Sequence, residues 1–223
     1  MRIVTIFLVL FLSFAFTAIA AESTVNCHCF TDRSYDHQNP RKVIPYLLAT
    51  TQNSFLSVAF NTPKFNLVKD LMAGVPSEQL WISHYFADRF NVDSKALLLT
   101  HQTKGSWRGA IQAAGFSEGG LPPSFVAAMQ AANDHMLAAA VVDDTLLNLM
   151  KVDADQLKRM RTTGADNREV ILCFFLAKRT DQQATEVFKS VTSGTTNWGT
   201  LAFIGNVQIG KMEQEFKALL NRE

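Results

Sequence analysis

The chain has little of what defines several large classes of protein. Only three of its 223 residues are cysteine, too few for a domain held together mainly by disulfides. It also lacks an excess of either charge, because 21 basic and 20 acidic side chains leave a formal net charge of +1. Such a balance gives no long-range attraction to DNA, RNA or anionic lipid. We therefore expect no nucleic-acid partner.

Signatures of catalysis are scarce as well. The sequence has no His-Glu-x-x-His zinc helix and no glycine-rich phosphate loop. Lytic glycosidases need a glutamate kept protonated in an apolar cleft. Glu78 and Glu169 instead lie in predicted first turns of helices, and Glu118 lies in a glycine-rich loop. The sequence leaves an enzyme possible but favours a non-catalytic protein.

The N-terminus has the organisation of a secretory signal peptide. A basic second residue precedes an apolar run over residues 3–16, and Ala18 and Ala20 provide small side chains before a cleavage site. We expect removal of residues 1–20 and export of the mature protein, either to the periplasm or out of the cell. An uncleaved anchor is the alternative, since residues 3–21 are just long enough to span a bilayer. No later run is long and apolar enough to do so.

The remaining sequence predicts an all-α fold. With 48% hydrophobic and 18% charged residues the chain can build a packed core, and its apolar residues recur at helical spacing between stop signals. We expect an N-terminal arm over residues 21–40, then one helical domain over residues 41–223 with about 10–12 short helices in an irregular array. The glycines and prolines of residues 115–123 cannot continue a helix. They divide the domain into possible halves, 41–115 and 123–223.

Local signals predict two helix starts in the C-terminal half. Asp166 with Glu169, and Thr180 with Gln183, have the spacing of a capping box, in which each side chain bonds a backbone N–H of the first turn.

A weak internal repeat runs through the chain. Segments that begin at Asp93, Asp153 and Asp181 each reach a glycine 12, 11 and 13 residues later, and a second apolar segment follows each glycine. The pattern predicts units of a helix, a glycine corner and a second helix. Because the starts lie 60 and then 28 residues apart, it does not predict a regular solenoid, and a diverged duplication stays open.

The third of these units resembles a helix-turn-helix motif. Ser193-Gly194, Trp198 and Gly205-Asn206-Val207 carry the resemblance, which implies that the second helix recognises DNA in the major groove. Expected export and the lack of a sufficient basic surface argue against this function.

The cysteines are the candidates for special chemistry. A disulfide could join Cys173 to Cys27 or Cys29, or Cys27 to Cys29 in a strained, easily reduced ring. A metal could instead bind Cys27, His28 and Cys29, with His37 as a further ligand. The simplest alternative makes Cys173 a small buried apolar residue. A thiol- or metal-dependent protein acting through Cys27, His28 and Cys29 is thus one functional hypothesis.

The favoured hypothesis is a non-catalytic binding or interaction module of the cell envelope. Phe125, Met129, Ala132, Met136 and Ala139 recur at alternating steps of four and three residues, which predicts one helix with a narrow apolar seam. That seam would line a groove for a protein or lipid-like partner, with Trp107 and Trp198 as anchors. This hypothesis requires no cofactor.

Overall fold

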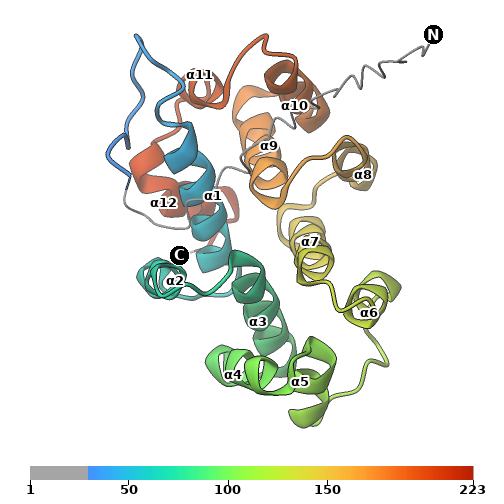
Figure 1. Ribbon diagram of the computed structural model, residues 1–223. Coiled ribbons are helices and arrows are strands. Elements are labelled where there is room, and N and C mark those ends of the chain that lie inside the picture. Colours follow the sequence, from blue (N-terminus) through green and yellow to red (C-terminus); the bar gives the residue numbers. More distant parts are fainter. Residues whose placement is uncertain (1–29, 223) are drawn as a thin grey trace, which may run out of the picture.

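The computed structural model describes residues 30–222, and residues 1–29 and 223 lie outside the described part. Every regular element between residues 30 and 222 is helical, which confirms the predicted all-α class (Figure 1). In that same part of the chain, no helix has the length and apolar character needed to cross a bilayer. The expected signal peptide falls outside the described residues.

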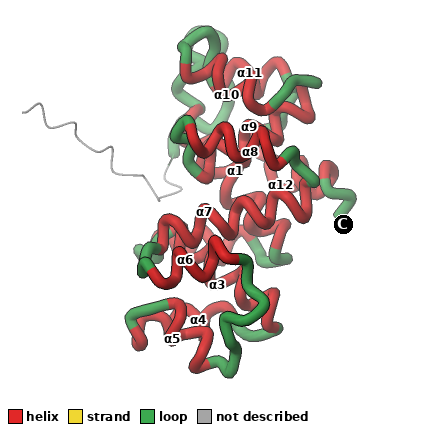
Figure 2. The backbone as a smooth tube through the Cα atoms, turned by 90° about the vertical axis from the view of Figure 1, so that its right-hand side faces the viewer, coloured by secondary structure: helices red, strands yellow, loops and turns green. Residues whose placement is uncertain are grey.

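Twelve α-helices and two short helical turns follow one another along the described chain. They are α1 (Ile44–Ala59), α2 (Lys64–Met72), α3 (Ser77–Phe90), α4 (Ser94–Lys104), α5 (Trp107–Ala113), α6 (Pro123–Gln130), α7 (Asp134–Thr145), η1 (Leu146–Met150), α8 (Ala154–Thr162), α9 (Asn167–Thr180), α10 (Ala184–Thr192), α11 (Trp198–Ile204), η2 (Ile209–Lys211) and α12 (Met212–Leu219). Figure 2 shows them stacked as an elongated pile, with α4 and α5 at one end and α10 and α11 at the other.

The helix boundaries recur with an offset of 90 residues. Both ends of α3 and α9 differ by 90, and so do the starts of α1 and α7, of α2 and α8, and of α4 and α10. The starts of α5 and α11 differ by 91, and those of α6 and α12 by 89. We call α1–α6 (residues 44–130) repeat A and α7–α12 (residues 134–219) repeat B. Two residues are called counterparts when their numbers differ by 90.

The same backbone turns punctuate both repeats. Asn91 ends α3 and its counterpart Asp181 ends α9, each with φ of 53° in the left-handed region. Gly74 follows α2 and its counterpart Gly164 follows α8, with φ of 90° and 93°. Glycine takes this conformation without the clash that a Cβ atom would bring. Equal turns at equal positions give α2 and α8, and likewise α3 and α9, the same lengths of 9 and 14 residues.

Each repeat packs its helices against those of the other repeat. Helix α3 of repeat A lies mainly on α7 of repeat B, and α9 of repeat B lies mainly on α1 of repeat A (Figure 1). In the same reciprocal way α6 packs on α7, and α12 packs on α1. The buried apolar residues of both repeats form one continuous cluster. The long helices of each repeat are therefore covered by helices of the other.

Aromatic contacts in the core repeat as well. Phe125 of α6 lies 5.2 Å from Tyr85 between ring centroids, and Phe216 of α12 lies 4.8 Å from Phe175, the counterpart of Tyr85. Both phenylalanines are almost fully buried. Each short terminal helix is thus fixed to its own repeat by an aromatic pair.

The single helix predicted across residues 125–139 is wrong, because α6 and α7 are separate. Ala132 adopts a left-handed conformation, with φ of 48°, and breaks the chain between them. The Asn133 side chain then accepts a hydrogen bond from the Met136 N–H at 3.0 Å and begins α7. Sequence spacing alone does not detect such a break when the apolar positions stay in register across it.

One of the two predicted capping boxes forms. Asp166 accepts from the Glu169 N–H, and Glu169 accepts from the Asp166 N–H, both at 2.9 Å. The box predicted at Thr180 and Gln183 is wrong. Thr180 is still inside α9, where its hydroxyl donates to the Leu176 carbonyl, and Gln183 itself precedes α10.

The arm over residues 30–43 crosses α11. Tyr35 stacks on Phe203 with 4.7 Å between ring centroids. The Pro40 carbonyl comes so close to Gly199 that a Cβ atom there would lie 2.1 Å from the oxygen. Glycine at this position is therefore required for the arm to reach its place.

Candidate functional site

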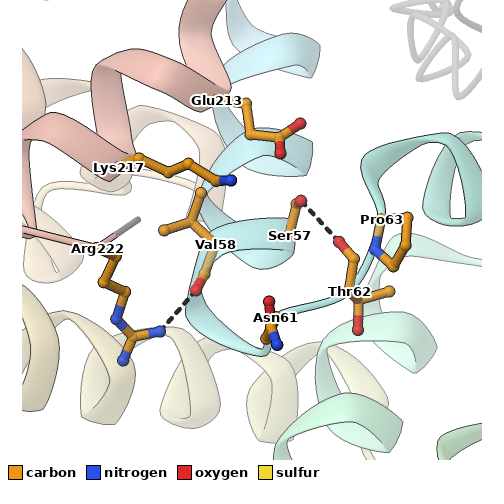
Figure 3. Close-up of a pocket in the computed structure, with 8 residues that line it drawn as sticks. All are labelled: Ser57, Val58, Asn61, Thr62, Pro63, Glu213, Lys217 and Arg222. Atoms are coloured by element: carbon orange, nitrogen blue, oxygen red, sulfur yellow. Dashed lines mark hydrogen bonds between the residues drawn. The ribbon is translucent and has the colours of Figure 1, made fainter.

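A polar cleft of about 550 Å³ opens where α12 lies against the end of α1. We call it the α1–α12 cleft. Six polar side chains line it, and Figure 3 shows them with Val58 and Pro63: Ser57, Asn61, Thr62, Glu213, Lys217 and Arg222.

One wall of the cleft is the turn between α1 and α2. Asn61 takes a left-handed conformation, with φ of 47°, directly after α1 ends. The Ser57 hydroxyl donates to the Thr62 carbonyl at 2.7 Å, and the Thr62 N–H donates to the Ser57 carbonyl at 3.0 Å (Figure 3). These two bonds hold the turn rigid, so the Asn61 and Thr62 side chains have fixed positions at the cleft.

Arg222 closes the cleft from the C-terminal side. Its guanidinium donates to the Val58 carbonyl at 2.6 Å and to the Ala59 carbonyl at 3.0 Å. The last carbonyls of a helix have no partner within the helix and carry partial negative charge, so a cation is stabilised there. Arg222 thereby ties the end of the chain to α1.

The opposite wall carries two charges that do not pair. Glu213 and Lys217 stand four residues apart on α12, in the order that favours an ion pair on a helix. Within residues 30–222, however, neither forms an ion pair within 4.0 Å. Both side chains extend from α12 toward the cleft (Figure 3). An acceptor and a donor of opposite charge are thus free to meet a ligand.

A buried polar pair lies behind this wall. The Lys64 ammonium donates to the Thr50 hydroxyl at 2.6 Å. Burial lowers the pKa of Lys64 to about 8, although the negative charge of Glu213 opposes the shift. A hydroxyl beside a lysine of low pKa is a known arrangement for nucleophilic catalysis. Thr50 is fully buried, however, so no substrate can reach its hydroxyl in this conformation.

The equivalent place in the molecule, where α6 lies against α7, carries a different set of side chains. Except for Asn61, whose counterpart Lys151 is also polar, the polar residues at and behind the cleft have apolar or small counterparts, with the cleft residue first in each pair: Thr50 and Ala140, Ser57 and Leu147, Thr62 and Val152, Lys64 and Ala154, Glu213 and Pro123, Lys217 and Ala127. The contact between α6 and α7 thus forms without most of these polar groups. The requirements of folding therefore do not explain why these polar groups gather around one cleft.

The residues predicted to bind a partner lie mostly in the core. Phe125, Met129, Trp107 and Trp198 are each 5% exposed or less, whereas Met136 is 50% exposed. The structure thus places only Met136 of this set at the surface, and the five do not line one open groove. Helical apolar spacing marks any buried face, and here that face is occupied by neighbouring helices.

Cys173 lies in the middle of α9 and is fully buried. Burial also raises the pKa of its thiol, which disfavours the reactive thiolate. Its counterpart Ser83 is likewise buried in α3. A small side chain therefore suits this position in both repeats.

The other thiol and metal candidates lie at or beyond the edge of the described chain. Cys27, His28 and Cys29 lie outside the described residues. His37 is exposed and packs against Phe203, with 4.6 Å between ring centroids. Between residues 30 and 222, no three His, Cys, Asp or Glu side chains are arranged to hold a metal ion. The disulfide and the metal site remain predictions.

One motif was missed in the sequence. Residues 115–119 spell Gly-Phe-Ser-Glu-Gly, which matches the nucleophile motif of α/β-hydrolases. That motif works only as a sharp turn between a strand and a helix. Here Ser117 is exposed in the loop between α5 and α6, and Glu118 pairs with Arg108. The match lacks its structural context.

Comparison with known proteins adds no assignment: no family model matches the chain, and neither the curated proteins nor the solved structures include a significant match.

Proposed function

We propose that the protein is exported, to the periplasm or out of the cell, and serves there as a non-catalytic binding module whose ligand site is the α1–α12 cleft. One observation carries the proposal. Polar side chains occupy the cleft and its rear wall in repeat A and α12, where every counterpart except Lys151, that of Asn61, is apolar or small.

The energetics of the cleft support binding. Charges without partners in a concave site lose part of their hydration and gain little in return, so they lower stability unless a ligand meets them. A cleft of about 550 Å³ lies within the range of small-molecule sites, about 300–1,000 Å³. The rigid turn at Asn61 and Thr62 and the Arg222 anchor keep the polar groups in place without a ligand, which favours affinity.

Export and binding are tested on the same preparation. Mass spectrometry of the protein purified from an envelope fraction should show a mature chain that begins after Ala20. An intact leader on a cytosolic product would contradict the proposed export.

Native mass spectrometry of the same preparation then tests for a co-purified ligand. We expect a small-molecule adduct that Lys217→Met removes and Lys158→Met retains, because Lys158 is an exposed lysine on α8, away from the cleft. An adduct that survives Lys217→Met, or the absence of any adduct from every preparation, would contradict the proposed site.

The thiol or metal alternative makes a different prediction. If Cys27, His28 and Cys29 carry the function, intact mass before and after reduction and alkylation should show a Cys27–Cys29 disulfide, or metal analysis should find a stoichiometric ion. The binding-module proposal expects neither.

A further inference from the structure

We propose that the α1–α12 cleft binds a zwitterionic solute, specifically a short peptide with a free amino end and a free carboxyl end. The inference rests on the proposed function and adds the chemical class of the ligand. It follows from the signs of the cleft's charges, from their separation and from the neutral groups between them.

The charges exclude ligands of a single sign. Glu213 presents a carboxylate, whereas Lys217 and Arg222 present cations. A phosphate or a dicarboxylate would meet Lys217 and Arg222 favourably but would be repelled by Glu213. A polyamine would be attracted by Glu213 but repelled by Lys217 and Arg222. A neutral sugar would leave all three charges without a partner of opposite sign. A solute with one ammonium and one carboxylate satisfies both walls.

The spacing suits a peptide better than a compact ion. Four residues of helix separate Glu213 from Lys217, a rise of about 6 Å along α12, and Arg222 lies beyond the end of that helix. The three charges thus extend from the first turn of α12 to beyond its last residue, which suits an elongated ligand better than a single small ion. A cleft of about 550 Å³ also has room for more than one amino-acid residue.

The neutral lining fits peptide groups. Asn61 brings an amide with donors and an acceptor on the rigid turn opposite α12, whereas the Thr62 hydroxyl bonds the Phe60 carbonyl and the His84 ring at 3.3 Å each. The Asn61 amide can bond the N–H and C=O groups of a peptide backbone. Val58 and Pro63 supply apolar contact for its side chains. We therefore assign the amino end to Glu213 and the carboxyl end to Lys217, with the Arg222 charge in support.

Calorimetric titration with trialanine and its blocked forms tests these assignments. The wild-type protein should bind trialanine saturably. N-acetylation, which removes the ammonium, should weaken binding at least about tenfold, and C-terminal amidation should do the same, since each removes a charge-assisted contact. Equal affinity for trialanine and its doubly blocked form would overturn the inference.

Variants connect each peptide end to its side chain. Glu213→Gln should lose affinity for trialanine and become insensitive to N-acetylation, while Lys217→Met should become insensitive to amidation. Lys158→Met is the matched control and should behave like the wild type. Both cleft side chains are on the surface of α12, so thermal melts should confirm that the variants fold. A variant that keeps the full sensitivity to its own blocking group would refute that assignment.

Three further probes distinguish a failure of the peptide inference from a failure of the proposed ligand site. Succinate, putrescine and glucose represent an anion, a cation and a neutral sugar. If one of them binds and Lys217→Met or Glu213→Gln abolishes the binding while trialanine does not bind, the peptide inference is wrong and the cleft is still a ligand site. If none of the four probes binds, the peptide inference is wrong, and the co-purified adduct alone decides whether the cleft is a ligand site.

Discussion

Repeat A and repeat B place the same helices in the same order but differ in what they bury. On the core side of α7, Val141 and Val142 are both fully buried, whereas their counterparts on α1 are Thr51 and Gln52. The Thr51 hydroxyl has no hydrogen-bond partner among the described residues. Burying such groups lowers stability compared with valine. Helices α7 and α6 show that the fold does not require such polar groups, and the departures of α1 and α12 from them indicate where other demands act.

The largest effect should come from the aromatic anchors that the repeats share. Phe216→Ala and Phe125→Ala each remove a buried ring that packs on Phe175 or Tyr85, and each should lower the free energy of unfolding by about 3–5 kcal/mol. Urea denaturation followed by circular dichroism measures both. If the free energy of unfolding of either variant falls by less than about 1 kcal/mol, the two phenylalanines are not equivalent anchors. The proposed equivalence of α6 and α12 would then be wrong.

A pair of counterpart glycines should respond unequally. Gly199→Ala places a methyl group 2.1 Å from the Pro40 carbonyl, so the arm must move, and we expect a loss of about 2–3 kcal/mol. In Gly109→Ala the nearest atom is the Ser106 hydroxyl oxygen at 3.0 Å, which can shift, and alanine favours the helix. Thermal melts should place this variant within about 1 kcal/mol of the wild type. Equal losses would show that the arm does not constrain α11.

An ion pair in repeat B has no charged counterpart in repeat A. Arg161 bonds Asp143 at 2.6 Å and Asn167 at 2.7 Å. In repeat A the counterpart of Arg161 is the buried Leu71, and the counterpart of Asp143 is Asn53, an amide. Arg161→Leu leaves the Asp143 carboxylate without its cation and should cost about 2 kcal/mol at pH 7. The double variant Asp143→Asn with Arg161→Leu recreates the repeat A pair and should recover most of the loss.

The pH dependence of Arg161→Leu follows from Asp143. In the wild type, burial raises the pKa of Asp143, and Arg161 holds it lower than burial alone would. Without Arg161 this pKa rises further in the folded state, so the carboxyl binds a proton at a higher pH when folded than when unfolded. The deficit should therefore shrink as the pH falls toward 4, as measured by urea titrations. A deficit that grows on acidification would contradict this account.

The sequence predicted what local signals encode. The helical class follows from apolar spacing and stop residues, and the capping box at Asp166 follows from one side chain and its neighbour three residues on. The 90-residue period escaped detection because it shows in the backbone and not in the caps. Asp153 caps α8, but its counterpart at α2 is Pro63, and Asp93 caps α4, but its counterpart at α10 is Gln183. A search for acidic caps therefore finds unequal intervals.

The cleft could not be predicted from local signals at all. Ser57 and Thr62 lie in one turn, and Glu213 and Lys217 lie about 150 residues later on α12. Taken alone, none of these residues differs from a polar residue found on any helix or turn. These four residues share one property, a polar side chain where the counterpart is apolar or small, and it becomes visible only after the structure gives the offset between the repeats.

The smallest effect concerns the lysine behind the cleft. Lys64→Met replaces a buried ammonium by an apolar side chain of similar length, and the counterpart in repeat B, Ala154, is also apolar. The folded-state pKa of about 8 lies below the ordinary value of 10.5, so the unfolded chain binds the proton more tightly and the charge destabilises the folded protein below pH 8. Because the Thr50 hydroxyl loses its partner, the net gain at pH 7 should be about 1 kcal/mol.

The sign of this effect must change the shape of the pH profile. Between pH 8 and pH 10.5, Lys64 of the folded wild type is already neutral while that of the unfolded chain is still charged. The free energy of unfolding of the wild type therefore rises with pH relative to that of Lys64→Met. The advantage of the variant should disappear by the upper end of this range, in urea titrations compared with Lys158→Met as the exposed control. An advantage that stays constant across the range would mean that Lys64 is solvated and that the rear wall of the cleft holds no strained charge.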